Sequence, residues 1–332
     1  MAVAVSERTL LWRRFRREHL ALAALVVLVV LLLACFVLEP LLEHLLGRTP
    51  DTPFMTAVSP HDLKPAGPWS WVANQPLDQA PRHGKTLFLL GADGSLGRDE
   101  LLRVLAGGRV SLEIALLATS IAMVVGVVLG TIGGWFGGLL DSTVARLTEL
   151  VMAFPLLLLV IAIGQTIALR LDGITFHGLF TRGVISLGVV IGLFTWFYPA
   201  RICRALVIEL RDREFVEAAR MVGSSETQIL RRHVAPHLLG PVIVWASFVA
   251  ASVIVLEASL SALNFGVHLP TASWGSLLSS SYGTLLNPYG ASSATHSNWP
   301  LVWPSVALFL TVLSLTLVGD GLRRALDPQA ER

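Results

Sequence analysis

The sequence is poor in charge and in cysteine. Of its 332 residues only 14% are charged, whereas 54% are hydrophobic, and the mean hydropathy is +0.67. Soluble domains carry roughly 25% charged residues, so this composition predicts a membrane protein that spans the lipid bilayer several times. The two cysteines, Cys35 and Cys203, lie in or beside apolar runs, which favours packing as small hydrophobes over a disulfide framework. A net charge of +2 is too small to indicate a nucleic-acid partner.

Signals for catalysis, metal binding and nucleotide binding are also lacking. The nine histidines show no metal-ligand spacing, so no metal site is predicted. The run Gly84-Lys85-Thr86 is similar to the end of a phosphate-binding loop, but Gln79 stands where the first glycine is needed. No nucleophile has a histidine or carboxylate partner at a recognisable spacing. We therefore predict no catalytic residues and no enzyme activity in this chain.

Long apolar runs are what the sequence does contain. A bilayer core needs roughly 20 apolar residues per helix, and about six segments qualify. The predicted fold class is an all-α integral membrane protein with about six transmembrane helices. Cys35 ends a possible lipoprotein cleavage box, but the apolar run continues to Leu38, so the first segment is expected to be retained. The predicted segments are 20–38, 111–134, 147–169, 184–205, 241–263 and 301–319.

Arginines predict the sidedness of these segments. Five arginines precede the first segment, which places the N-terminus in the cytoplasm by the positive-inside rule. Alternation then places 206–240 and the C-terminal tail inside, and the arginines of both agree. The loop 264–300 on the opposite side contains no Lys or Arg, although Arg170 and Arg182 lie in another outside loop. A multi-pass protein of the cytoplasmic (inner) membrane, with both termini cytoplasmic, is expected.

The resulting division of the chain has four parts. Residues 1–46 form the cytoplasmic N-terminus and first transmembrane helix, and 47–110 form an extracytoplasmic loop. That loop ends in an interfacial helix near 96–105, where Leu101, Leu102 and Leu105 share one face. Residues 111–322 form a core of five transmembrane helices with the cytoplasmic loop 206–240, and 323–332 form a cytoplasmic tail.

The cytoplasmic loop has the pattern of two short helices that meet at a corner. Residues 214–222 are helical by propensity, Gly223 can adopt a left-handed stop, and Ser225 with Gln228 has the spacing of a capping box. One interpretation is an ordinary amphipathic loop at the membrane surface. The other is a rigid knob in which Ala218 and Ala219 allow close approach, with Glu217 and Arg220 available to a partner.

Several motifs, taken in order and spacing over residues 91–328, resemble one family. That family is the inner-membrane permeases of binding-protein-dependent ATP-binding-cassette importers, within it the second permease of dipeptide, oligopeptide and nickel importers. The chain departs from the family at Ala92 and His237, and its loop 45–90 is longer. The motifs are Leu96-Gly97-Arg98-Asp99, Gly133-Gly134-Trp135-Phe136-Gly137-Gly138 with Asp141, Ala153-Phe154-Pro155, Glu217-Ala218-Ala219 with Gly223 and Pro236, Glu257-Ala258-Ser259-Leu260-Ser261, Ser273-Trp274-Gly275, Gly319-Asp320-Gly321-Leu322-Arg323 and Leu326-Asp327-Pro328.

The resemblance implies a type I importer permease fold and a set of partners. It implies a homologous permease, two ATPase subunits that bind ATP and magnesium, and an extracytoplasmic solute-binding protein, with no cofactor in this chain. Peptides are the implied cargo, and nickel or another small solute is the alternative. An ion-coupled secondary transporter is a rival, but the paired intramembrane charges that it needs are not found. The ATPase-coupling residues implied by the resemblance are Glu217, Ala218, Ala219, Arg220, Gly223, Ser225 and Pro236.

Residues inside the predicted helices have two interpretations each. A carboxylate at mid-membrane costs about 2.5 to 3.5 kcal/mol, so Glu257 is expected to bond a neighbouring helix or to contact a cationic substrate group. With Ser259 and Ser261 it is a candidate for the translocation pathway.

Glycines at 126, 130, 134 and 138 form a stripe for packing within the chain or against a partner permease. Pro155 and Pro199 can kink their helices.

The outside loop 264–300 is a candidate docking surface for the solute-binding protein. The loop contains no Lys or Arg, and it is rich in aromatic residues. The aromatic residues proposed for this contact are Trp274, Tyr282, Tyr289 and Trp299.

Overall fold

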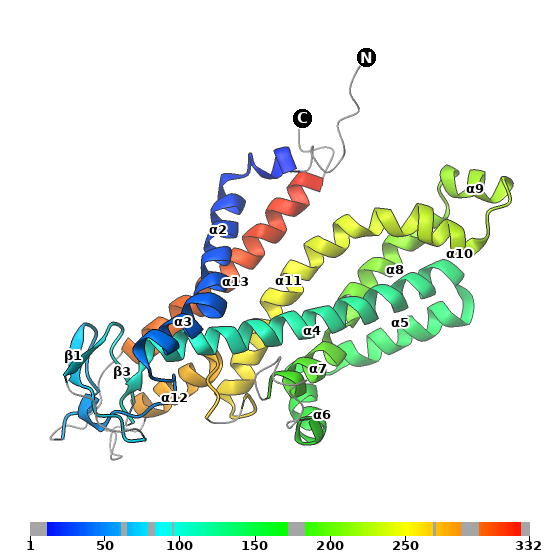
Figure 1. Cartoon of the computed structure of the whole chain (residues 1–332). Helices are drawn as coiled ribbons and strands as arrows, with labels where there is room; N and C mark the ends of the chain where they lie inside the picture. The colour runs from blue at the N-terminus through cyan, green and yellow to red at the C-terminus, as the bar shows by residue number, and fades with distance from the viewer. Residues whose placement is uncertain are drawn as a thin grey trace.

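The computed structural model describes residues 12–60, 65–78, 84–94, 96–171, 183–267, 270–286 and 299–326. Helices dominate it, as Figure 1 shows. In chain order they are α2 (His19–Leu33), a π-helical turn (Ala34–Leu38), α3 (Glu39–Leu46), α4 (Glu100–Phe136), α5 (Gly138–Ala153), α6 (Leu156–Leu171), α7 (Val184–Thr195), α8 (Phe197–Arg211), α9 (Glu214–Met221), α10 (Glu226–Ile229), a second π-helical turn (Leu230–Val234), α11 (Ala235–Ala262), α12 (Trp274–Leu286) and α13 (Trp299–Leu326).

Five helical rods in the described chain are long and apolar enough to cross a bilayer, and a bent pair makes a sixth. The prediction of an α-helical membrane protein with about six spans is therefore confirmed. The rods are His19–Leu46, Glu100–Phe136, Val184–Arg211, Glu226–Ala262 and Trp299–Leu326, and the pair is Gly138–Ala153 with Leu156–Ile163.

The third predicted span, 147–169, is not a straight helix. Its residues belong to α5 and α6, which are bent by 91° at the break between them. Pro155 has no backbone N–H and disfavours a helical conformation of the residue before it, and Phe154 is indeed extended (φ −99°, ψ 141°). The proline predicted to kink this helix divides it instead. Pro199 lies in the first turn of α8, where proline is tolerated.

Helix α4 is the centre of the bundle and contacts α5, α7, α8, α11 and α12. Ile114, Ala118 and Ala122 on α4 are fully buried, as are Ile191 on α7 and Ile254 on α11. Helix α13 packs between α2 and α11 (Figure 1). The small residues on α4 let its neighbours approach closely, which is how helices associate in a membrane without a hydrophobic driving force.

The glycine stripe of α4 packs against α8 of the same chain. A Cβ atom placed on Gly126 would lie 2.5 Å from the carbonyl oxygen of Trp196, and one on Gly130 would lie 2.3 Å from that of Ala200. A Cβ on Gly134 would lie 2.8 Å from the carbonyl oxygen of Arg204. The two helices therefore touch backbone to backbone over two turns, and the interpretation as packing within the chain is confirmed for these three glycines. Nothing lies within 4 Å of a Cβ on Gly138.

Two small antiparallel hairpins lie at the end of the molecule where α3 ends and α4 begins (Figure 1). Strand β1 (Ser70–Ala73) pairs with β2 (Lys85–Phe88), and β3 (Ala92–Asp93) pairs with β4 (Arg98–Asp99). Their shared core contains Phe54, Val72 and Phe88, and the rings of the two phenylalanines meet edge to face at 5.5 Å. These strands were not expected from the sequence.

Helix α4 begins at Glu100, so the interfacial helix predicted over 96–105 differs from the structure. Leu96 lies in a turn and Arg98–Asp99 form a strand, after which one continuous helix runs to Phe136. The Asp99 carboxylate accepts a hydrogen bond from the backbone N–H of Leu101 at 2.9 Å, which caps the helix N-terminus. Aspartate is a preferred N-cap residue, and this preference decides where the helix starts.

Buried ion pairs attach the hairpins to α4. Arg103 on α4 pairs with Asp51 at 2.7 Å and with Asp93 at 2.5 Å, and Arg48 pairs with Asp99. The Arg48 guanidinium also lies over the Phe88 ring at 4.7 Å. Burial lowers the pKa of Arg48 and raises that of Asp99, and each shift is opposed by the charge of the other residue. Removal of either charge would leave the other one buried and unpaired.

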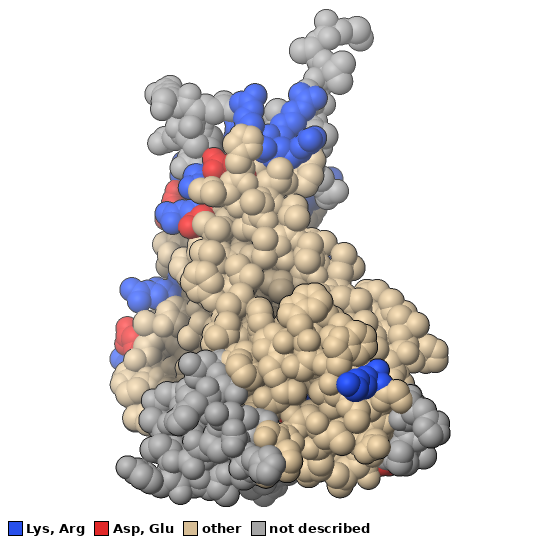
Figure 2. Space-filling view, turned by 90° about the vertical axis from the view of Figure 1, so that its left-hand side faces the viewer, with Lys and Arg blue, Asp and Glu red and all other residues tan. Residues whose placement is uncertain are grey.

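Charged side chains gather at the opposite end of the molecule. In the face shown in Figure 2, Lys and Arg cluster where α2 begins and α13 ends, above a broad surface with few charges. Arg324 of α13 pairs with Glu18 there, at 3.1 Å. Helices α9 and α10 also lie toward this end, away from the hairpins (Figure 1).

Candidate functional site

The predicted corner between α8 and α11 is present, and we call residues 212–229 the elbow. Helix α9 ends at Met221, and Gly223 adopts a left-handed conformation with φ +88°. The Ser225 hydroxyl accepts a hydrogen bond from the backbone N–H of Gln228 at 3.4 Å and caps α10. The local predictions for the glycine stop and the serine cap are therefore confirmed.

The elbow has a hydrophobic core of its own. Val216 on α9 and Ile229 on α10 are fully buried, and they pack with Trp135 of α4, Val207 of α8 and Leu238 of α11. Each such aliphatic side chain stabilises the packed state by about 1.5–3 kcal/mol when it is fully buried. The elbow is consequently fixed to three long helices, which favours a rigid knob over a loosely held amphipathic loop.

The predicted coupling residues divide by exposure. Glu217, Ala218 and Pro236 are exposed, and the proline lies in the first turn of α11. Ala219 is half-buried against the elbow core. These positions leave a polar, small-residue face of α9 open to a partner, so the coupling role stays a prediction for them.

Arg220 makes contacts within the chain. Its Nε donates to Glu226 Oε1 at 2.9 Å, across the turn that joins α9 and α10, and its guanidinium lies 5.6 Å from the Trp135 ring centroid. The hydrogen bond to Glu226 raises the pKa of Arg220 above its ordinary value. Arg220 thus holds the elbow closed, a contact that the sequence did not indicate.

The most exposed apolar residues of the elbow were not predicted from the sequence as contact residues. Met221 and Val222, at the end of α9, are 83% and 87% exposed. Phe215, on the first turn of α9, is also exposed, and its ring lies 5.5 Å from that of His237. The position of Met221 and Val222 directly before the glycine stop was the available signal, because residues at a corner tip are left uncovered. Exposed apolar patches that are surrounded by polar residues mark protein interaction sites.

An ion pair joins α5 to α8 near the base of the elbow. Arg204 bonds Asp141 with two guanidinium nitrogens, one of them at 2.7 Å, although the two residues are 63 positions apart. Arg211 Nη1 lies 3.4 Å from the carbonyl oxygens of Gly134 and Trp135 at the end of α4. The helices that support the elbow are therefore also joined to one another by charged side chains.

Glu257 lies in a closed hydrogen-bond network inside the chain. It has no exposed surface, and it accepts from the hydroxyls of Ser273 at 2.7 Å, Ser261 at 2.9 Å and Ser111 at 3.1 Å. The backbone N–H of Trp274 donates to Ser111 Oγ at 3.1 Å, which extends the network. The geometry supports the structural interpretation of Glu257, because both carboxylate oxygens already accept hydrogen bonds from serine hydroxyls of this chain.

The other two pathway candidates differ from each other. Ser261 is 4% exposed and belongs to the Glu257 network, so within this chain it faces no open space. Ser259 is half-buried, and its hydroxyl bonds the Val255 carbonyl of its own helix at 2.8 Å. Contact with a transported solute therefore stays a prediction, with Ser259 as the more accessible of the two.

The aromatic residues predicted to meet a solute-binding protein are placed only in part. Trp274 is 1% exposed, and its indole Nε1 donates to the Val104 carbonyl at 2.9 Å, so it is a packing residue and not a docking residue. Trp299 is half-buried. Tyr289 and the side chain of Tyr282 lie outside the described residues, as do Arg8, Arg182 and the tail beyond Leu326.

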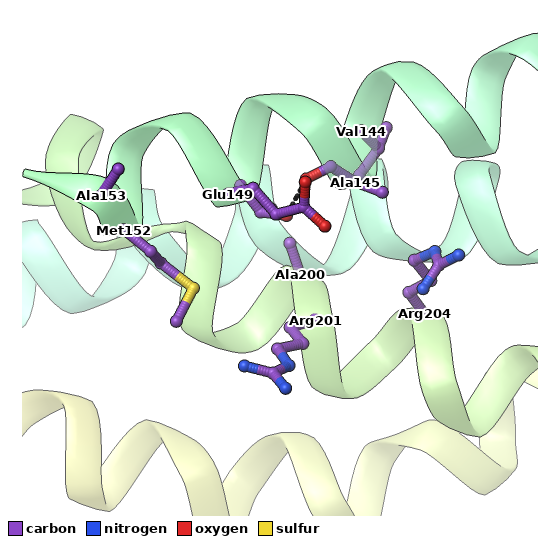
Figure 3. A pocket seen from close by; sticks show the side chains of 9 residues that line it. Val144, Ala145, Glu149, Met152, Ala153, Ala200, Arg201 and Arg204 are labelled. Atoms are coloured by element: carbon purple, nitrogen blue, oxygen red, sulfur yellow. Dashed lines mark hydrogen bonds between the residues drawn. The ribbon is translucent and has the colours of Figure 1, made fainter.

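A pocket of about 500 Å³ lies between α5 and α8 (Figure 3). It contains the side chains of Glu149 and Arg201, which are both exposed, and its floor is formed in part by Ala200. No sequence motif pointed to it, because its two walls are more than 40 residues apart in the chain. The residues that line it are Val144, Ala145, Thr148, Glu149, Met152, Ala153, Ala200, Arg201 and Arg204.

Comparison with known proteins identifies the family. The model of the binding-protein-dependent transport system inner membrane component matches residues 126–332. The chain belongs to this family. Its residues 8–66 also match the N-terminal transmembrane domain of oligopeptide transport permease C. The prediction of a transport subunit of an ATP-binding-cassette importer, and not an enzyme, is therefore confirmed.

Individual relatives cover nearly the whole permease. The chain is 37% identical to the oligopeptide transport system permease protein OppC of Escherichia coli K12, over 96% of its own length and 89% of that protein. It is 36% identical to OppC of Salmonella typhimurium LT2 and 31% identical to the glutathione transport system permease protein GsiD of E. coli O6:K15:H31, each over the same shares of the two chains. The similarity thus includes the first span, which the sequence motifs at 91–328 did not.

Proposed function

We propose that this permease is the second membrane subunit of a peptide importer and that the elbow couples it to an ATPase. The observation that carries the proposal is the elbow core: Val216 and Ile229 are fully buried against α4, α8 and α11, while the tip at Met221 and Val222 is uncovered. A partner that grips this tip would displace three long helices together. Rigid-body motion of this kind is a standard route between two states of a transporter.

The orientation of the chain in the membrane is inferred from the distribution of charge. The start of α2 and the end of α13 meet at the end of the molecule where arginines gather, and the elbow lies toward that end (Figures 1 and 2). Cytoplasmic loops of membrane proteins carry an excess of Lys and Arg. We infer that the elbow and both termini are cytoplasmic and that the β hairpins are extracytoplasmic.

The partner set follows from the family, and its details are part of the proposal. A homologous permease would complete the pathway, two ATPase subunits would bind ATP and magnesium, and a solute-binding protein would deliver the cargo. This chain would hold no cofactor of its own. Peptides are proposed as cargo over nickel, because relatives that match 96% of the chain are named for oligopeptides and for glutathione.

Uptake by the assembled importer tests the coupling role. The full complex is reconstituted in liposomes, and residues 214–224 are replaced by a Gly-Ser linker of equal length. We expect ATP-driven peptide uptake to be lost, whereas Thr143→Ala, at an exposed position of α5 outside the elbow, leaves it unchanged. Full uptake with the flexible linker would overturn the proposal.

Labelling of Val222→Cys tests the sidedness. Cys35 and Cys203 are each 2% exposed, so a membrane-impermeant maleimide should react only with the new thiol. The permease is expressed without the ATPase subunits, which would cover the tip, and we expect labelling in inverted membrane vesicles and none in intact cells. Labelling in intact cells would place the elbow outside and contradict the assignment.

A further inference from the structure

The pocket between α5 and α8 contains two oppositely charged side chains besides that of Arg204. Glu149 lies on α5 and Arg201 lies on α8, and both line the same hollow (Figure 3). Within the described part of the chain, neither side chain has an ion pair or a hydrogen bond. Arg204, one turn further along α8, is by contrast bonded to Asp141 with two nitrogens, and its positive charge also attracts Glu149.

Both residues belong to segments that are candidates to span the membrane. Arg201 is within Val184–Arg211, and Glu149 is within the bent pair that begins at Gly138. An unpaired charge in a span is costly, and such residues are found facing cavities, where they mark the pathway of an ion or a substrate. Glu149 and Arg201 are both exposed in this chain, so each is free to bind a charged group that enters the pocket.

The walls of the pocket suit a small flexible ligand. Ala145, Ala153 and Ala200 contribute short side chains, which leave the space open, and Met152 adds an adaptable apolar surface. The volume of about 500 Å³ lies within the range of roughly 300–1,000 Å³ that is typical of small-molecule sites. A lipid chain would leave both charges unpaired in an apolar environment, so it fits less well.

We propose that Glu149 and Arg201 form a subsite for a zwitterionic peptide on the translocation pathway. Glu149 would pair with the ammonium group at the peptide N-terminus, and Arg201 would pair with a carboxylate, for which its planar guanidinium is suited. This inference rests on the proposed function, since it names the substrate chemistry of this permease. The pocket contributes one wall of the route, and the elbow moves that wall through α8.

The test uses tri-alanine and N-acetyl-tri-alanine in liposomes that contain the complete importer with its binding protein. Glu149→Gln is compared with wild type, and the ratio of uptake of the two peptides is measured for each. The preference of the binding protein is the same in both complexes, so it cancels when the two ratios are compared. Loss of a charge-assisted hydrogen bond weakens recognition by about 10- to 100-fold. We expect tri-alanine uptake to fall by about 10-fold or more, with a much smaller fall for the acetylated peptide.

Matched variants separate recognition from folding. Glu149→Asp keeps the charge and should restore most of the tri-alanine uptake. Arg201→Gln should impair tri-alanine more than its C-terminal amide. Arg146→Gln on α5 and Glu209→Gln on α8 remove exposed charges that do not line the pocket, and they should leave the ratios unchanged.

Two outcomes would overturn the subsite. Uptake by Glu149→Gln equal to that of the controls would exclude a role for the charge, and an equal loss of free and acetylated peptide would indicate a contact with the partner permease or with lipid. Either result leaves the proposed function intact if the wild-type complex transports tri-alanine. Failure of the wild-type complex to transport either peptide would instead reject peptide import itself, and the subsite with it.

Discussion

Ser273 donates its hydroxyl to the carboxylate of Glu257 at 2.7 Å, across a separation of 16 residues. This contact brings together two of the motifs that identified the family, the one that begins at Glu257 and the one that begins at Ser273. Gly275 lies in the same contact, where a Cβ atom would come within 2.7 Å of Ala258 Cα. The two motifs are therefore one structural unit, which joins α11 and α12 to Ser111 of α4.

Replacement of Glu257 tests this unit. Glu257→Ala leaves three buried hydroxyls without their acceptor, and each unsatisfied buried group costs about 1–3 kcal/mol. We expect a large loss of thermal stability of the purified permease. Glu257→Gln should be much milder, because its carbonyl still accepts and its amide can donate to Ser111 Oγ. Ser252→Ala, on the same helix but bonded only to the Phe248 carbonyl of its own turn, serves as the control.

The same variants distinguish a structural role from a transport role. A glutamine at position 257 that folds as stably as wild type should also support normal uptake if the carboxylate is purely structural. Normal stability combined with a strong loss of uptake would instead place Glu257 on the pathway.

Gly130 and Gly133 form a matched pair for the packing of α4. A Cβ on Gly130 would come within 2.3 Å of the Ala200 carbonyl oxygen, whereas one on Gly133 would meet Val144 Cβ at an ordinary 3.4 Å. Overpacking of a close contact costs about 1–3 kcal/mol, so Gly130→Ala should lower the thermal stability in detergent. Gly133→Ala should change it little. Equal effects of the two variants would show that the backbone contact of α4 with α8 is not tight.

Gly223 provides a test of the rigidity of the elbow. Nothing lies within 4 Å of a Cβ at this position, so Gly223→Ala acts only through its left-handed backbone, a conformation that costs an L-residue about 1–2 kcal/mol. We expect less uptake per ATP hydrolysed, with partial rescue by Gly223→Asn, because asparagine tolerates this conformation. Gly138→Ala, with φ +59° and equally open surroundings at the α4–α5 corner, is the control for backbone strain outside the elbow. If both alanine variants lowered coupling alike, strain anywhere in the permease would explain the result.

Local and composition-based features were predictable from the sequence. Apolar length located the spans, and the Gly223 stop and Ser225 cap were predicted because each depends on neighbouring residues only. The 91° bend at Pro155 was not, because a proline marks where a helix can break while the packing around it determines the angle. Helix α4 extends beyond its apolar run to Glu100, since its start is set by the Asp99 cap and by ion pairs with the hairpins.

Features of the site that depend on distant residues could not be predicted. Arg220 was expected to be available to a partner, but its guanidinium donates to Glu226 and lies over the Trp135 ring. Trp274 was expected at the outer surface, but the glycines of α4 leave room for its ring: a Cβ on Gly108 would come within 2.6 Å of it. The pairing of Asp141 with Arg204 and the pocket beside it likewise require helices that are far apart in the sequence.

Met221 and Val222 provide the final test, since the coupling proposal predicts that the elbow tip is covered in the complex. Both side chains are almost fully exposed in this chain, so Met221→Ser and Val222→Ser should change its own stability by no more than about 0.5 kcal/mol. Burial of such a side chain against a partner is worth about 1.5–3 kcal/mol, which corresponds to about 10- to 100-fold in affinity. We therefore expect the ATPase subunits to dissociate more readily during purification of either variant, with Thr143→Ala on α5, outside the elbow, as the unaffected control. Undiminished co-purification of the ATPase with both serine variants would mean that the partner grips another face of the elbow, such as that of Glu217 and Ala218.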